Sequence, residues 1–273
     1  MGHKETERRA ARTKDIDLSI EIDASPEAVW RAISDGEELA RWFPLEAEIV
    51  PGVGGTVTLA WGPDVVGTGH IDVWEENRRL RYVESGGDQD VVVQEGGDEA
   101  AVVAVEYTIE GRGGRTVLRL VNSGFSADDD WAEYFDTVES GWRYFLLNLK
   151  HYLERHDGTP RRMVWDRREI SLPKPDAWEQ LFGAGGLVAT QLPGAAGQDG
   201  TLWSGHPVAV EMVAHPLHLA CRCEELNDAL LFVELEPGQD TYSLGVWLSL
   251  YGVAEDQAQE LERSLGDCLE RLF

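Results

Sequence analysis

The residues best suited to bind a ligand are large aromatic side chains in the first half of the chain. They recur on segments whose periodicity favours one buried face. Pockets for small molecules are mostly apolar with a few polar anchors, so these rings could sandwich a flat or greasy ligand. The predicted ligand-binding residues are Trp42, Phe43, Trp61, His70, Trp74, Tyr107, Phe125, Gly141, Trp142 and Phe145.

Two of these residues have specific expected roles. His70, on an apolar segment near Trp74, would be a polar anchor for a ligand. Gly141, at the edge of an aromatic stripe, would permit the close approach of a sheet or a ligand, because it has no side chain. The alternative is that the rings simply fill a core, and the sequence favours neither interpretation.

A second cluster, HPLHLACRC, holds His215, His218, Cys221 and Cys223, which are all competent zinc ligands. On a strand, however, His218 would face away from the other three side chains. The gap between the two cysteines is also shorter than in zinc knuckles. We therefore expect ordinary strand residues and no metal site.

The sequence contains no hydrolase elbow, phosphate-binding loop, dinucleotide fingerprint or HExxH motif. Its adjacent acidic pairs would diverge on a strand instead of facing one another. We therefore predict no catalytic residue and no cofactor.

A long amphipathic helix over Asp128–His156 would position the aromatic residues. Its large side chains fall along one line at the helical period, and that stripe must be buried. Before it, the pattern predicts a mobile tail over 1–14, a strand over Ile16–Ile22, and a helix capped by Ser25. Further strands are expected after Ala47, near 67–74, 79–83, 101–110 and 116–122, with a loop over 86–99.

These segments together resemble a known family. The motifs SPEAVWRAI, ARWFP, PGVGGTV, NSGF and LNLKHYL occur in an order similar to that of the activator-of-Hsp90-ATPase-homologue branch of the START-like (SRPBCC) superfamily. The resemblance covers about residues 15–156. It implies an α+β helix-grip fold, in which a curved antiparallel sheet closes around a C-terminal helix and leaves a cavity between them.

The second half repeats this plan in shortened form. PKPDAWEQLF echoes SPEAVWRAI, GTLW echoes GTVTLAW, and a last helix is expected over Glu255–Leu272. A strand over Arg168–Leu172 would open the copy, after a linker near Asp157–Pro160. We therefore predict a tandem duplication: a tail over 1–14, a START-like ligand-binding domain over 15–157, and a degenerate START-like domain over 161–273 with a scaffold or pairing role.

The composition limits the classes of partner that this protein is expected to bind. The formal net charge of −26 argues against a nucleic-acid partner, because two polyanions repel one another. The sequence has no long apolar run and no signal-peptide pattern, and its three cysteines are typical of a reducing compartment. We expect a cytoplasmic protein that does not insert into membranes and that could pair with a protein partner or as a homodimer.

The favoured function is that of a non-enzymatic START-like protein that binds a small hydrophobic molecule in its first domain. Two alternatives stay open. One is a co-chaperone-like interaction protein, since the namesake of this branch stimulates a chaperone ATPase. The other is an enzyme resembling polyketide cyclases and aromatases, with His70 as an acid or base.

Overall fold

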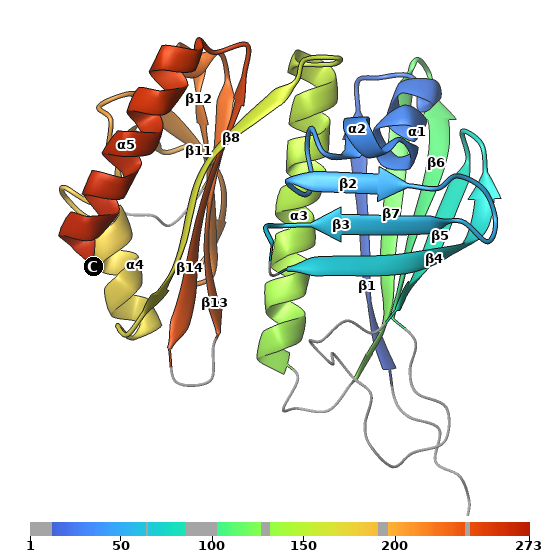
Figure 1. Cartoon of the computed structure of the whole chain (residues 1–273), viewed down its shortest axis with the longest axis horizontal. Coiled ribbons are helices and arrows are strands. Elements are labelled where there is room, and N and C mark those ends of the chain that lie inside the picture. The colour runs from blue at the N-terminus through green and yellow to red at the C-terminus, as the bar shows by residue number, and fades with distance from the viewer. Residues whose placement is uncertain (1–12, 64, 86–102, 127–131, 191–195, 238–240) are drawn as a thin grey trace, which may run out of the picture.

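A computed structural model shows two antiparallel sheets with one long helix between them (Figure 1). The structure describes residues 13–63, 65–85, 103–126, 132–190, 196–237 and 241–273. The first sheet has the strand order β1-β7-β6-β5-β4-β3-β2, and the second has the order β8-β14-β13-β12-β11-β10-β9. Adding seven to each strand number of the first sheet gives the second, so the two sheets share one topology.

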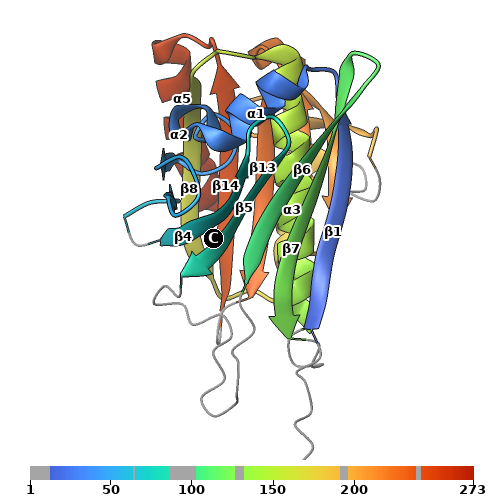
Figure 2. The same ribbon diagram turned by 90° about the vertical axis from the view of Figure 1, so that its right-hand side faces the viewer.

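The first sheet curls around α3 (Figure 2). Its strands are β1 (Thr13–Ile22), β2 (Glu46–Ile49), β3 (Thr56–Ala60), β4 (Val66–Glu75), β5 (Arg79–Ser85), β6 (Ala104–Arg112) and β7 (Arg115–Ser126). Two short helices, α1 (Pro26–Ser34) and α2 (Gly36–Leu39), follow β1. The Ser25 side chain accepts a hydrogen bond from the Ala28 amide at 3.3 Å, as predicted for the cap of α1.

The long helix α3 (Ala132–Arg155) is present, and its predicted start before Ala132 lies outside the described residues. Phe135, Trp142, Leu146 and Leu149 pack into the core of the first sheet. Most of the predicted tail and the predicted 86–99 loop also lie outside the described residues. Thr13 and Lys14, assigned to that tail, instead begin β1.

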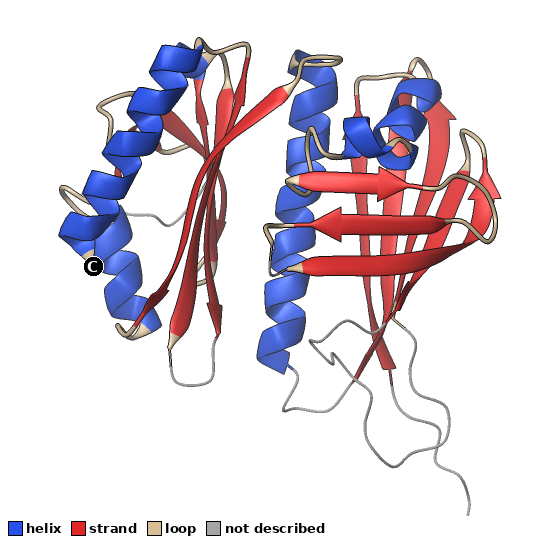
Figure 3. Ribbon diagram, in the orientation of Figure 1, coloured by secondary structure: helices blue, strands red, loops and turns tan. Residues whose placement is uncertain are grey.

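The second sheet has β8 (Arg161–Ile170), β9 (Val188–Thr190), β10 (Asp199–Leu202), β11 (Pro207–Ala214), β12 (His218–Cys223), β13 (Ala229–Pro237) and β14 (Tyr242–Tyr251). Helices α4 (Lys174–Phe182) and α5 (Glu255–Leu272) cover the face that points away from α3 (Figure 3). A short 3₁₀ turn, η2 (Glu224–Leu226), joins β12 to β13.

The tandem helix-grip fold is therefore confirmed: each sheet is followed by its own C-terminal helix. The prediction that the first strand of the copy spans Arg168–Leu172 is wrong, because β8 begins at Arg161 and pairs with β14 along its whole length. The sequence predicts too short a strand because apolar and polar residues do not alternate along β8. Val164 faces the α5 side, whereas Met163 packs in the cluster beside α3, so apolar residues occur on both faces.

Candidate functional site

Four of the predicted aromatic residues meet around Phe43, between α3 and the β2–β3 edge of the first sheet. The Phe43 ring lies 5.3 Å from Trp61, 5.2 Å from Trp142 and 4.5 Å from Phe145, measured between ring centroids. It also stacks on Trp42 at 5.4 Å. These distances are typical of favourable aromatic pairs. The ARWFP segment thus forms one wall and α3 the other.

Trp142 joins this cluster to the centre of the sheet. Its ring lies 6.4 Å from Tyr107, and its indole Nε1 donates a hydrogen bond to Asn122 Oδ1 at 2.9 Å. The Asn122 side chain in turn donates to the Ala104 carbonyl at 3.1 Å. All three residues are buried, so this hydrogen-bond chain fixes the orientation of the indole within the core.

Two other predicted rings lie in separate groups. Trp74 packs edge-on against Trp30 of α1, with centroids 5.1 Å apart. Phe125 contacts Phe135 and Tyr134 of α3, at 5.5 and 6.4 Å. The structure therefore divides the predicted set into three groups along the interior.

His70 does not face the interior, so its predicted role as an internal anchor is wrong. Its side chain is exposed, whereas its neighbour Ile71 is buried. The cause is a β-bulge: Ile71 pairs with Tyr82 but Val73 pairs with Arg81, so one extra residue shifts the alternation. Trp74 beyond the bulge is directed inward, and His70 before it is directed outward.

The expected close approach at Gly141 is also not found. A Cβ atom added at Gly141 would have no neighbour within 4 Å. The close approach on the inner face is instead at Gly69, where an added Cβ would lie 2.8 Å from Cδ2 of Tyr82. The missing side chain at Gly69 therefore makes room for the Tyr82 ring.

Polar groups gather beside the aromatic residues, and only Tyr107 among them is a predicted site residue. The Tyr82 and Tyr107 hydroxyls lie close enough to influence each other's pKa, and both are within electrostatic range of the Glu84 carboxylate. Tyr134 of α3 is in range of the same carboxylate. We name Tyr82, Glu84, Tyr107 and Tyr134 the tyrosine–glutamate group.

The titration of this group follows from its surroundings. Burial raises the pKa of Tyr134 to about 12 and the pKa values of Tyr82 and Tyr107 above their usual range, so all three hydroxyls stay protonated. The Glu84 side chain reaches solvent, yet partial desolvation raises the pKa of its carboxyl. Three protonated hydroxyls and one carboxyl therefore form the polar part of an aromatic interior.

One signal could have found this group. In RLRYVES, the alternation that buries Leu80 and Tyr82 also directs Glu84 to the inner face, where it pairs with the buried Gly69. The predicted strand ended at Val83, one residue too early. Tyr134 gave no comparable signal, because its position on the aromatic stripe is typical of a core residue.

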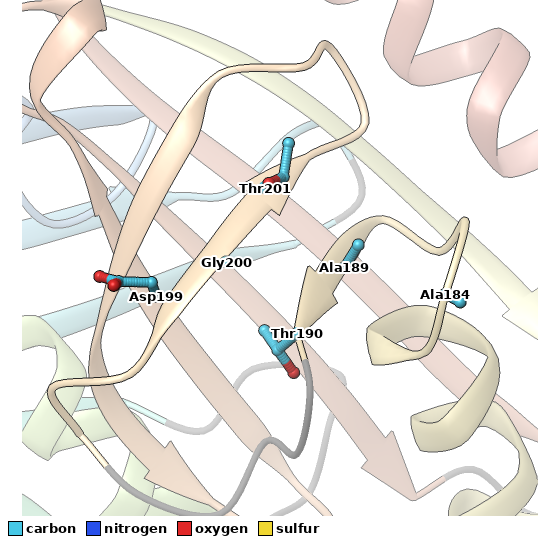
Figure 4. Close-up of a pocket in the computed structure, with 6 residues that line it drawn as sticks. All are labelled: Ala184, Ala189, Thr190, Asp199, Gly200 and Thr201. Atoms are coloured by element: carbon cyan, nitrogen blue, oxygen red, sulfur yellow. The ribbon is translucent and has the colours of Figure 1, made fainter.

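The second half contains fewer candidate site residues than the first. Cys221 and Cys223 lie in the core beneath α5, and His218 faces α3, as the strand period predicts. His215 lies outside β12, edge-on to Trp178. A shallow hollow of about 290 Å³ is lined by Ala184, Ala189, Thr190, Asp199, Gly200 and Thr201 (Figure 4). Among the residues that the structure describes, no three His, Cys, Asp or Glu side chains are placed to hold a metal ion.

Comparison with known proteins agrees with this architecture. Residues 23–154 match the family model for activator of Hsp90 ATPase homolog 1-like proteins. A search of curated proteins gave no match. No helix in the described parts of the chain is long and apolar enough to cross a membrane.

Several solved structures are similar at low identity. The Aha1 dimer from Colwellia psychrerythraea is 20% identical, covers 53% of this chain and 99% of its own, and has a TM-score of 0.44. DynU16, a putative protein in the dynemicin biosynthetic locus, is 16% identical over 92% of this chain and 93% of its own, with a TM-score of 0.43. The di-domain ARO/CYC BexL from the BE-7585A biosynthetic pathway is 15% identical over 95% of each chain, with a TM-score of 0.45.

The motifs at ARWFP and NSGF, the sheet that closes around α3 and the family match all concern the same segment. Residues 23–154 therefore form a domain of the activator of Hsp90 ATPase homologue 1-like family, within the START-like superfamily, and a second helix-grip domain follows it.

Proposed function

We propose that this protein binds a small hydrophobic molecule with one polar end, between α3 and the inner face of the first sheet. The tyrosine–glutamate group is the observation that carries the proposal. Three hydroxyls and a carboxyl face an interior that is otherwise lined by rings and aliphatic side chains. The Tyr82 and Tyr107 side chains are buried in this interior, where their hydroxyls can hydrogen-bond to the polar end of a ligand.

The position of the group supports entry from one end of the fold. Glu84 is exposed and Tyr134 is partly exposed, while Tyr82 and Tyr107 are buried behind them. A ligand that entered beside Glu84 would place its polar end against Tyr82 and Tyr107. Its apolar body would lie along Phe125 and Phe135, which contact each other at 5.5 Å.

The test is a fluorescence titration of the full chain with 2-naphthol, a flat molecule with one hydroxyl. We expect saturable binding that is about 5- to 30-fold weaker in Tyr82→Phe and Tyr107→Phe, because each variant loses one buried hydrogen bond of about 1–2 kcal/mol. His70→Phe is the matched control, since its side chain lies on the outer face, and it should bind as the parent does. Saturable binding that all three variants share equally would place the ligand elsewhere.

Absence of saturable binding by the folded parent, with a range of apolar probes, would favour the interaction-protein alternative. In that case the rings around Phe43 form a packed core, and the family's namesake activity indicates a chaperone as the partner to test. Direct binding of an Hsp90-type protein, measured without any small molecule, separates the two functions.

Glu84 also favours a second candidate, an enzyme of the cyclase kind. A carboxyl with a raised pKa can act as a general acid or base, and protonated tyrosines can hydrogen-bond to a carbonyl oxygen. Glu84→Gln separates the candidates. It should abolish turnover of a polyketone substrate by an enzyme, but it should change the affinity of a binding protein only modestly.

A further inference from the structure

A second polar site lies at the seam between α3 and the second sheet. Arg161 of β8 pairs with Tyr251 of β14, and Met163 pairs with Ser249. Residues directly opposite each other on antiparallel strands point to the same face. Arg161, Ser249 and Tyr251 are therefore directed together, and Tyr144 of α3 reaches the same place, in electrostatic range of Arg161.

Arg161 is unusual among the arginines of this acidic protein. Its side chain is partly buried, desolvation lowers the pKa of its guanidinium, and its Nη2 donates a hydrogen bond to the Pro44 carbonyl of the first half. Within the described ranges no carboxylate pairs with it, and the groups that favour its charge are the Tyr144 and Tyr251 hydroxyls. The adjacent Arg162 shows the usual arrangement, since it pairs with Glu255 and with Glu262.

Neutral hydroxyl groups surround this cation. The Tyr144 ring stacks on Phe232 with centroids 3.6 Å apart, which fixes its hydroxyl at the seam. The Tyr251 hydroxyl is already used, because it donates to the Arg41 carbonyl at 2.7 Å. Ser249 lies close to both tyrosine hydroxyls, yet its buried Oγ makes no hydrogen bond of good geometry with the described residues. Burial of an unpaired hydroxyl costs free energy, so a hydrogen bond from Ser249 to a ligand would be favourable.

The other titratable groups nearby do not supply the missing negative charge. Glu234 is in range of Tyr144, but it accepts a hydrogen bond from Trp247 Nε1 at 2.8 Å, and burial raises its pKa. His156 stacks on the Tyr251 ring at 4.2 Å, and burial lowers its pKa. Both groups therefore favour their neutral forms, and the Arg161 charge stays uncompensated.

We infer that Arg161, with the Tyr144 and Ser249 hydroxyls, binds the carboxylate of a small organic acid at the seam between the two halves. One guanidinium supplies one positive charge, and its planar fork matches the two oxygens of a carboxylate. The hydroxyls can donate to the same oxygens. This inference is independent of the site proposed in the first half, which lies on the opposite side of α3.

The experiment is a calorimetric titration of the full chain with benzoate, at low chloride concentration, beside the neutral isostere benzamide. We expect saturable binding of benzoate, little binding of benzamide, and a loss of at least tenfold in benzoate affinity in Arg161→Gln. Arg162→Gln is the matched control: it removes the same charge one residue away but points to the other face of β8, and it should bind as the parent does.

Tyr144→Phe and Ser249→Ala keep the test usable if Arg161→Gln fails to fold, because each removes one hydroxyl and keeps the packing. Each should weaken benzoate severalfold, and Tyr82→Phe should not. A folded parent that binds no benzoate would overturn the inference. So would a benzoate affinity that is equal in the parent and in folded Arg161→Gln, or in all three seam variants.

Discussion

At the scale of single residues, Trp142 links several parts of the first core. Its ring contacts Phe43, Tyr107 and Phe145, and its Nε1 satisfies the buried Asn122 oxygen. We expect Trp142→Ala to lower the free energy of unfolding by about 3–5 kcal/mol, the usual cost of truncating a buried tryptophan.

Trp142→Phe separates packing from hydrogen bonding. It keeps an aromatic ring but leaves Asn122 Oδ1 without its donor, so we expect a smaller loss of about 1–3 kcal/mol. Urea denaturation of both variants checks the order. Equal stability of the parent and Trp142→Ala would mean that the ring contributes nothing to the core.

His151 predicts a pH effect. Its Nε2 lies 2.6 Å from the Asp228 carbonyl, and burial lowers its pKa to about 4, although the Asp228 contact raises it in part. His156 and Arg155 also face this ring and oppose its protonation. The folded protein therefore holds His151 neutral, while the unfolded chain protonates near pH 6.5.

The protein should lose stability as the pH falls, because protonation of His151 favours the unfolded state. As the pH falls from 7 to 5, His151 is protonated in the unfolded state but stays neutral in the folded state. The free energy of unfolding should therefore fall by about 2 kcal/mol because of His151. His151→Gln should lack this loss. The stability difference between parent and variant, measured by denaturation at both pH values, should shift by that amount in favour of the variant at pH 5. Parallel pH profiles would show that His151 titrates normally in the folded protein.

At the scale of elements, bulges decide which side chains line the interior. The shift between Ile71 and Val73 directs His70 outward. A second irregularity, where Lys14 pairs with Phe125 but Ile16 pairs with Asn122, directs both Asn122 and Phe125 inward. Gly124 lies at this point with φ of 96°, a conformation that favours glycine.

Gly69 tests the packing of β4 against β5. Gly69→Val should destabilise the protein by about 1–3 kcal/mol, because the new side chain would collide with Tyr82 and with the Val83 carbonyl, 3.0 Å from an added Cβ. Gly67→Val is the control on the same face of the same strand, where an added Cβ meets nothing within 4 Å. A thermal melt in which both variants lose equal stability would contradict this account.

At the scale of the whole molecule, α3 belongs to both halves. One face packs into the first core, and on the other Tyr144 stacks on Phe232 while Ser140 Oγ lies 2.5 Å from His218 Nδ1. The second sheet is therefore buried on both faces. Its inner face is covered by α5, and its outer face packs against α3.

Removal of the second half should expose this surface. We expect residues 13–158 alone to melt at a lower temperature than the full chain and to self-associate, because Tyr144 and Leu147 lose their cover. Light scattering after size-exclusion chromatography measures the association. The same fragment with Tyr144→Ser and Leu147→Ser should stay monomeric. A parent fragment that is monomeric and as stable as the full chain would show that the seam contributes little.

The sequence by itself determined most of the elements and their order, although β9 and most of β8 were not predicted. The helical stripe of α3, the Ser25 cap, and the repeated strand and tryptophan-bearing helix at Trp30 and Trp178 are local patterns, set by backbone period and hydrogen bonding within a few residues. Together with the resemblance of motifs such as ARWFP and NSGF to a known family, they were sufficient to predict the tandem helix-grip fold.

Only the tertiary structure decided where the polar groups lie. A bulge on β4 inserts one residue and reverses every later side chain of that strand, so a period-two pattern placed His70 inside. Glu84 of β5 was missed because the predicted strand ended at Val83. The second apolar face of α3 and the uncompensated charge of Arg161 depend on segments far apart in the chain: Ser140 meets His218, 78 residues away, and Arg161 meets Pro44, 117 residues away. Such long-range contacts leave no local pattern, because nothing near Arg161 in the chain marks the absence of its counter-ion.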